Sequence, residues 1–137
     1  IAGLLFLAKR FSKESIVMNI LGAKDKEHLP YLAEFEKSGN TFVATEDEGI
    51  GTKGTVADLL NAINKCGPNF MNDHYFFNCG PRAMVEAVLP LELQITKPAN
   101  IYSSLDYLTK CGVGLCGSCA DKKGRRTCVE GPFMKLS

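Results

Sequence analysis

The 137-residue chain lacks an apolar run long enough to span a membrane, a strong excess of one charge, and a recognisable secretory signal. The apolar residues Ile1–Ala8 are too few to cross a bilayer, and Lys9 and Arg10 follow them, so this stretch predicts a buried helix instead. The net charge of +1 gives no indication of nucleic-acid binding. We therefore expect neither a membrane nor a nucleic acid among the partners.

Histidine is scarce as well, and neither His28 nor His74 forms a nucleophile–base pair, so the sequence indicates no hydrolytic site. There is no initiator methionine, and the chain begins inside the predicted helix. We expect a fragment whose upstream part is missing. Six cysteines without a secretory signal favour a reducing, cytoplasmic compartment.

The most informative feature present is a group of cysteines near the C-terminus. Cys111, Cys116 and Cys119 have the C-x4-C-x2-C spacing of plant-type [2Fe–2S] ferredoxins, and Cys128 supplies a fourth thiolate. Thiolates are the ligands that suit iron–sulfur clusters. The sequence therefore predicts a [2Fe–2S] cluster on these residues and, with it, a role in electron transfer.

Glycines within this motif fit a loop wrapped tightly around a cluster. Gly112, Gly114 and Gly117 permit positive φ and leave backbone N–H groups free to point at sulfur. A structural zinc held by four cysteines is one alternative, and disulfides are another. Cys66 and Cys79 lie well away in sequence, which is unlike a secreted disulfide framework.

Hydrophobic periodicity predicts strands that alternate with helices, as in a parallel α/β sheet. The last part of the chain departs from this rhythm, with a short helix, the cysteine loop and a hairpin turning at Asp121–Gly124. We expect an NAD(P)-binding domain over residues 1–99 and an iron–sulfur lobe over residues 100–137. The predicted strands are 16–21, 41–45 and 75–79, and the predicted helices are 1–8, 26–37, 54–65 and 82–89.

A formal G-x-G-x-x-G, Gly49 to Gly54 with Gly51 at its centre, follows a predicted strand and opens a helix. It is a candidate for cradling a pyrophosphate. Its strand is the second visible here, however, whereas the fingerprint belongs to the first βα turn, and no carboxylate ends a strand about 20 residues further on. The alternative is a glycine-rich loop beside the nucleotide site or on the surface.

The run Asn78-Cys79-Gly80-Pro81 ends a predicted parallel strand, where open α/β sheets bind ligands. Gly80 lets a flat ring approach the backbone, and Cys79 is placed to touch the edge of a nicotinamide. Cys79 fits equally well as a small buried hydrophobe.

These segments together resemble a known family. Leu4-Leu-Phe-Leu-Ala8, Phe77-Asn-Cys-Gly-Pro-Arg-Ala-Met84 and Cys111-Gly-Val-Gly-Leu-Cys-Gly-Ser-Cys119, with the trailing Cys128-Val-Glu-Gly-Pro132, are similar to the electron-transfer subunit of dihydroorotate dehydrogenase. Its relatives are the gamma subunits of sulfhydrogenases and the small subunit of sulfide dehydrogenase, or NADH-dependent ferredoxin:NADP oxidoreductase. All belong to the ferredoxin–NADP reductase superfamily.

The resemblance implies a β-barrel that binds FAD, a Rossmann-like domain that binds NAD(P)H, and a small C-terminal [2Fe–2S] lobe. The barrel and the first strand of the nucleotide domain are expected upstream of Ile1. The implied partner is a catalytic oxidoreductase subunit of the dihydroorotate dehydrogenase, hydrogenase or glutamate synthase kind. The rival hypothesis is a non-catalytic redox-sensing or structural module with a four-cysteine zinc site.

The resemblance also implies roles for particular residues. It makes Cys111, Cys116, Cys119 and Cys128 the cluster ligands, and it places Cys79, Gly80 and Pro81 behind the nicotinamide. Glu46 and Asp47 match the segment that holds the adenosine ribose, where two acids favour NAD(H) over NADP(H). Lys24 and Lys53 favour NADP(H) as the alternative, since either can reach a phosphate. Each can equally be a solvated surface lysine.

Overall fold

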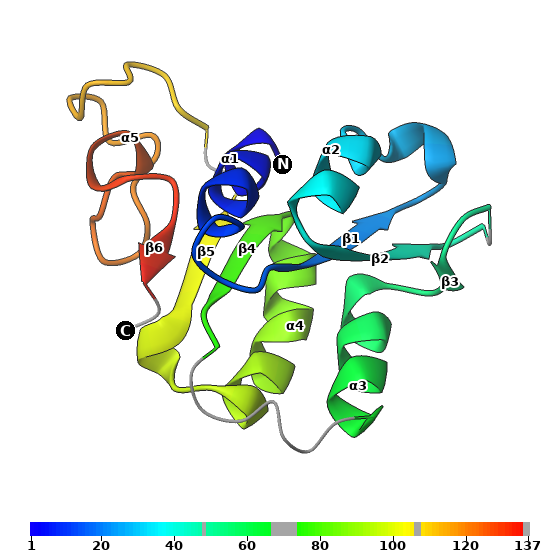
Figure 1. The fold of residues 1–137 in the computed structure, drawn as a ribbon. Helices are drawn as coiled ribbons and strands as arrows, with labels where there is room; N and C mark the ends of the chain where they lie inside the picture. The colour runs from blue at the N-terminus through cyan, green and yellow to red at the C-terminus, as the bar shows by residue number, and fades with distance from the viewer. Residues whose placement is uncertain (48, 67–73, 106–107, 136–137) are drawn as a thin grey trace. The chain divides into compact units, whose positions relative to one another are not determined.

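The computed structural model describes residues 1–47, 49–66, 74–105 and 108–135 (Figure 1). The chain divides into two compact units, Ile1–Phe70 and Met71–Ser137, and each is described by itself. Within the described ranges, no helix has the length and apolar character needed to cross a membrane.

The first unit contains a parallel three-stranded sheet in the order β1-β2-β3, formed by Met18–Ala23, Asn40–Thr45 and Thr52–Lys53. Helix α3 (Val56–Cys66) packs on β1 and β2, while α1 (Ala2–Phe11) packs on α2 (Leu32–Ser38), and α2 also contacts β2. In Figure 1, α2 and α3 lie on opposite sides of this sheet. This is the layered arrangement that buries both faces of parallel strands.

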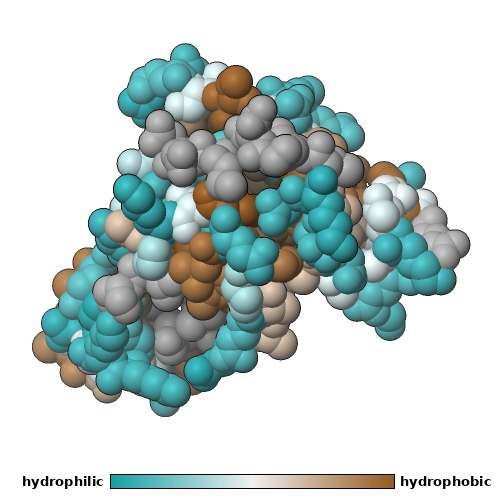
Figure 2. All heavy atoms as spheres, turned by 90° about the horizontal axis from the view of Figure 1, so that it is seen from below, coloured by the Kyte–Doolittle hydropathy of each residue, from teal (hydrophilic) through white to brown (hydrophobic). Residues whose placement is uncertain are grey.

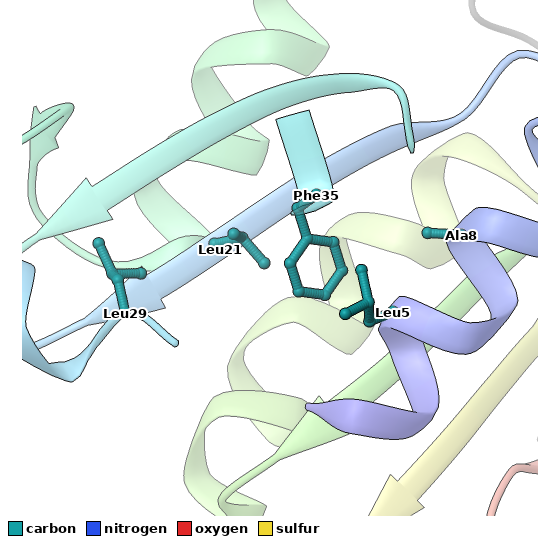
Figure 3. Close-up of a cluster of buried hydrophobic side chains, with 5 residues drawn as sticks. All are labelled: Leu5, Ala8, Leu21, Leu29 and Phe35. Carbon is teal, nitrogen blue, oxygen red and sulfur yellow. The ribbon is translucent and has the colours of Figure 1, made fainter. Parts of the chain in front are cut away.

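A compact apolar cluster holds these layers together. The ring of Phe35, which is 1% exposed, lies between Leu21 of β1 and Leu5 of α1 (Figure 3). Side chains alternate along a strand, so Leu21 faces this cluster while Gly22 faces the other side. There a Cβ on Gly22 would lie 2.4 Å from Cγ2 of Val56 at the start of α3, so the glycine allows close helix–sheet packing.

The helix predicted over residues 26–37 is wrong in its first half. Lys26–His28 form a single 3-10 turn, and α2 begins only at Leu32. Pro30 explains the break, because proline has no N–H to donate and disfavours helical backbone at the residue before it. Tyr31 then caps α2 with a left-handed φ of 63°.

The second unit is built on β4 (Phe76–Gly80) and β5 (Ile101–Leu105), which pair in parallel, with β6 (Met134–Lys135) antiparallel to β5. Helix α4 (Arg82–Ile95) packs on β4 and β5. It continues past the predicted end at Leu89 and through Pro90, because one missing N–H does not outweigh this packing. The 3-10 turn Pro98–Asn100 leads into β5.

The short helix predicted after residue 101 is also misplaced. Ile101–Leu105 form strand β5, whose first residue is fully buried, and the short helix α5 (Thr127–Glu130) follows the cysteine loop instead. Because β5 pairs with β4, these residues form part of the sheet, and the cysteine loop begins only after them. Strands and helices otherwise match the expected α/β class.

Hydrophobic groups lie exposed among hydrophilic ones on the face shown in Figure 2. The large exposed hydrophobic residues include Ile16, 94% exposed, and Leu115, 86% exposed. Leu115 lies in the cysteine loop, so that loop is not covered by its own unit.

Candidate metal centre

The loop from Cys111 to Cys119 is shaped by glycines in left-handed backbone. Gly112, Gly114 and Gly117 have φ values of 70°, 80° and 73°, a conformation that other residues adopt only at a cost. The turns direct backbone N–H groups inward: those of Leu115 and Cys116 lie 3.3 and 3.5 Å from Sγ of Cys111. The loop is thus preorganised around a sulfur atom, as the sequence predicted.

These contacts change the acidity of Cys111. The backbone N–H of Cys116, followed by that of Val113, lowers the pKa of the Cys111 thiol from 9.0 to about 6, with the Cys116 thiol and the Leu115 N–H adding to the effect. Hydrogen bonds to the charged form stabilise a thiolate. A thiolate is the form that binds metal.

Cys119 and Cys128 form a second pair, with sulfur atoms 3.4 Å apart. Cys119 is 2% exposed. Backbone N–H donation from Cys128, with help from Thr127, lowers the pKa of Cys119, whereas the contact with Cys119 raises the pKa of Cys128. Cys119 is therefore the more acidic thiol of the two.

The structure brings the four cysteines together two by two. Within the residues it describes, no three His, Cys, Asp or Glu side chains are arranged around one point as a metal site. A zinc site needs four thiolates about a single ion, whereas a two-iron cluster takes two thiolates on each iron. The 3.4 Å separation of Cys119 and Cys128 is close to the ~3.8 Å edge of a tetrahedron with metal–sulfur bonds of about 2.3 Å. This spacing suits two thiolates on one tetrahedral metal ion, whether iron or zinc.

Disulfides receive no support from the geometry. Cys79, Cys111, Cys116, Cys119 and Cys128 are all free thiols. The 3.4 Å between the sulfurs of Cys119 and Cys128 is far longer than the ~2.05 Å of a disulfide bond. The side chain of Cys66 lies outside the described part of the structure.

The hairpin predicted at Asp121–Gly124 is present and is closed by an ion pair. Gly124 donates to the Asp121 carbonyl at 3.0 Å, and the flanking residues Ala120 and Arg126 form an antiparallel bridge. Nε of Arg125 donates to Oδ2 of Asp121 at 2.7 Å, and backbone N–H groups donate to Oδ1 of the same carboxylate. The hairpin holds Cys119 and Cys128 side by side.

An aromatic cluster anchors the end of the cysteine segment (residues 108–135) to the strands. Phe77 of β4 stacks on Tyr102 of β5 with ring centroids 5.2 Å apart. Phe133 meets the Phe77 ring edge-on at 5.9 Å. Together with the β5–β6 pairing, this fixes the position of the segment within its unit.

The residues predicted to hold the adenosine lie at the carboxyl ends of β1 and β2. The backbone N–H of Glu46 donates to the Lys24 carbonyl at 3.2 Å, which brings the two residues together. Asp47 accepts a hydrogen bond from the Gly49 N–H at 2.9 Å and so shapes the loop. Glu46 and Asp47 are both exposed.

Gly51 has a structural reason to be glycine. Its φ is +74°, and a Cβ there would lie 2.2 Å from the Val43 carbonyl oxygen, so the loop folds back tightly on β2. The neighbouring Gly54 donates to the Thr45 carbonyl at 3.0 Å, and Thr55 then caps α3 through Asp58. The G-x-G-x-x-G pattern therefore has a structural role in the turn from strand β2 to helix α3, independent of any ligand.

Cys79, Gly80 and Pro81 lie at the carboxyl end of β4 and the start of α4, as predicted, in the second unit. A Cβ on Gly80 would lie 2.7 Å from the Met84 methyl group, so the glycine makes room for that side chain. The structure thus groups the sequence-predicted residues into separate sets, the cysteine segment and strand β4 in one unit and the adenosine residues in the other.

Two features of the second unit were not found from the sequence. Glu92 of α4, which is 2% exposed, accepts a hydrogen bond from the Asn78 amide at 2.8 Å, and burial raises the pKa of its carboxyl. Arg126 reaches across the cysteine loop to the Gly114 carbonyl. No sequence signal separates Arg126 from its neighbour Arg125, and a glutamate in a helix is ordinarily exposed.

Known proteins resemble both the cysteine segment and the chain as a whole. Residues 108–137 match the family model for the iron–sulfur cluster binding domain of dihydroorotate dehydrogenase B. The chain is 36% identical over 137 residues to the electron transfer subunit of dihydroorotate dehydrogenase B (NAD(+)) of Fusobacterium nucleatum, covering 96% of this chain and 50% of that protein. The corresponding subunit of Geobacillus sp. is 31% identical over 136 residues, covering 94% and 49%.

A solved structure of an NADH-dependent reduced ferredoxin–NADP oxidoreductase, studied for flavin-based electron bifurcation, has a similar fold. Its chain superposes with a TM-score of 0.74 at 26% identity, covering 98% of this chain and 48% of that one. The chain thus spans about half the length of the relatives it matches. The resemblance and the α/β fold class inferred from the sequence are confirmed.

Proposed function

We propose that this chain, a relative of the electron transfer subunits of dihydroorotate dehydrogenase B, takes part in electron transfer. In this proposal, electrons pass between NAD(P)H, a flavin and a [2Fe–2S] cluster, and from the cluster to a partner oxidoreductase subunit. The observation that carries the proposal is the arrangement of four free cysteines as two pairs inside the segment that matches the cluster-binding family. A [2Fe–2S] cluster, when bound, exchanges one electron at a time.

The chain's own residues have distinct tasks in this account. Cys111 and Cys116 hold one iron, and Cys119 and Cys128 hold the other. The N–H groups of Leu115 and Cys116 stabilise the Cys111 thiolate by donating to its sulfur. Such hydrogen bonds, together with burial, are how a protein sets a cluster's potential.

The nucleotide in this proposal is NAD(H). Exposed Glu46 and Asp47 at the end of β2 repel a 2′-phosphate and can accept hydrogen bonds from a ribose 2′-OH. Lys24 is proposed to reach a phosphate of the nucleotide and Gly51 to lie against its pyrophosphate, while Cys79, Gly80 and Pro81 back the nicotinamide. Titrating NADH and NADPH into the purified protein tests this preference, and tighter binding of NADPH would refute it.

A flavin is required between nicotinamide and cluster, because NADH gives a hydride while the cluster takes single electrons, and a flavin handles both. FAD is proposed to bind a region of the protein outside this chain. We therefore expect the chain alone not to oxidise NADH, although dithionite should reduce its cluster. The partner is proposed to be a catalytic subunit of the dihydroorotate dehydrogenase, hydrogenase or glutamate synthase kind, in the cytoplasm.

Metal analysis after anaerobic preparation distinguishes this proposal from a zinc-bound structural or sensing module. We expect about two iron atoms and two acid-labile sulfides per chain, with a brown colour that bleaches on reduction. One zinc per chain with no sulfide, in a colourless protein, would establish the alternative instead.

A further inference from the structure

The Arg126 side chain contains a buried nitrogen with no hydrogen-bond partner among the described residues. Of the buried side-chain nitrogen and oxygen atoms in the described residues, only its Nε lacks a hydrogen-bond partner. Buried polar groups are nearly always paired, and an unpaired donor on a charged group is especially unfavourable. An unpaired donor of this kind indicates that an acceptor is supplied by something other than the described residues.

The rest of the guanidinium group is held firmly. Nη1 donates to the Gly114 carbonyl at 2.5 Å, and Nη2 lies 4.0 Å from Oε1 of Glu130. The Arg126 backbone N–H also donates to Oε2 of Glu130 at 2.5 Å. The Arg126 side chain as a whole is 40% exposed, so water reaches part of it while Nε is shielded.

The position of this side chain relates it to both cysteine pairs. Arg126 lies two residues before Cys128 in the hairpin that also holds Cys119. Its guanidinium contacts Gly114, which lies between Cys111 and Cys116. The side chain therefore spans from the hairpin that carries Cys128 to the loop between Cys111 and Cys116.

Gly114 makes this approach possible. A Cβ at that position would lie 3.4 Å from Nη1 of Arg126 and 2.6 Å from Cγ2 of Val129. The glycine thus serves the loop by its φ of +80° and also leaves space for the guanidinium. This is a reason for glycine that the cysteine spacing alone does not give.

We propose that the Nε–H of Arg126 donates a hydrogen bond to a sulfur of the cluster held by Cys111, Cys116, Cys119 and Cys128, and so raises its reduction potential. The inference rests on the proposed function, since it needs the cluster. Reduction adds negative charge to the cluster, and a donor on a cation stabilises that charge more than it stabilises the oxidised state.

Arg125 provides a matched control in the same hairpin. Its Nε donates to Asp121 at 2.7 Å and its Nη1 to the Lys135 carbonyl at 3.1 Å, so the nitrogen that corresponds to the unpaired Nε of Arg126 is bonded within the protein. Replacing it removes the same formal charge without removing a donor to sulfur. A general electrostatic effect would appear in both variants, and a specific hydrogen bond only in the Arg126 variants.

The test is a redox titration of the reconstituted holoprotein, followed by electron paramagnetic resonance, for Arg126→Met, Arg126→Lys and Arg125→Met. Both Arg126 variants should lower the potential by about 59 mV or more, a tenfold change in the one-electron reduction equilibrium. Arg125→Met should shift it by much less. Because Arg126→Lys keeps the charge, its shift cannot come from a change of net charge.

Electron–nuclear double resonance in H₂O and D₂O supplies a second readout. The reduced wild-type cluster should show a strongly coupled exchangeable proton that disappears in Arg126→Lys and persists in Arg125→Met. Equal potentials in all variants, or the same exchangeable proton in Arg126→Lys, would overturn the inference. Absence of a cluster from the wild-type protein would instead refute the proposed function.

Discussion

Glycines behave differently in the two regions of the molecule. In the unit Ile1–Phe70, a Cβ on Gly39 would lie 2.3 Å from the Val17 carbonyl oxygen, and one on Gly51 would lie 2.2 Å from that of Val43. In the cysteine segment, Gly112 and Gly117 have positive φ, yet no atom lies within 4 Å of the Cβ position. Gly39 and Gly51 thus allow close packing, whereas Gly112 and Gly117, unlike Gly114 of the same segment, serve only the course of the backbone.

Burial follows the same division. The first unit has an apolar cluster around Phe35, but of the described residues in the cysteine segment only Cys119 is buried. The α/β layers therefore stabilise themselves by removing apolar surface from water. The cysteine segment has hydrogen bonds, one hairpin and an aromatic anchor, and we infer that it depends on the group its cysteines hold.

Loss of a cysteine ligand should have the largest effect. Replacing Cys119, the buried member of its pair, by serine should abolish stoichiometric iron and sulfide binding, because the pair with Cys128 cannot then hold an iron through two thiolates. Iron and sulfide analysis together with the visible spectrum measures this.

Cys79→Ser is the matched control, since it changes a thiol that lies in strand β4 and forms no disulfide. The cluster spectrum should be unchanged. Loss of the cluster in this variant, or its retention in Cys119→Ser, would show that the ligands are assigned wrongly.

Truncation of the apolar cluster should affect stability without affecting the metal site directly. Phe35→Ala removes a ring that is 1% exposed and should lower the free energy of unfolding by about 3–5 kcal/mol. Urea denaturation followed by circular dichroism gives this value. A loss below about 1 kcal/mol would mean that this cluster is not the core of the unit.

Two glycine substitutions compare the regions directly. Gly51→Ala adds a methyl group against the Val43 carbonyl in addition to an unfavourable φ, so it should cost more than about 3 kcal/mol. Gly112→Ala has a similar φ but open space, and should cost only about 1–2 kcal/mol. Equal losses of stability would show that packing does not distinguish the two loops.

Glu92→Gln should have the smallest effect, and a stabilising one. Burial raises the pKa of Glu92, so the folded protein binds more protons than the unfolded chain between the unfolded and folded values, and stability falls as pH rises through that window. Glutamine still offers an oxygen to the Asn78 amide. The variant should gain on the order of 1 kcal/mol at pH 8 and less at pH 5. A gain that does not change with pH would mean that the Glu92 carboxyl is not destabilised by burial.

Sequence patterns predicted those parts of the fold where local signals are strong. The cysteine spacing located the candidate site, and the alternation of apolar strands with helices identified the α/β class. Apolar periodicity extends across Pro30 and so predicts one helix over 26–37, although the proline breaks it. Strand β5 was missed because its pairing with β4 is a long-range contact that local periodicity does not report.

The candidate site shows the same limit. The sequence identifies which cysteines belong together but not that they form the pairs Cys111–Cys116 and Cys119–Cys128. It also gives no means of separating Arg126, with its unpaired Nε, from Arg125, which is bound to Asp121. Both facts depend on how the hairpin folds against the loop.

Hydrogen exchange on the apo and the reconstituted protein tests most directly whether the two regions owe their stability to different sources. Amides in residues 108–135 should exchange much more slowly once the cluster is restored, while those of β1, β2 and α3 should be equally protected in both forms. Equal protection of the cysteine segment with and without its cluster would contradict the account.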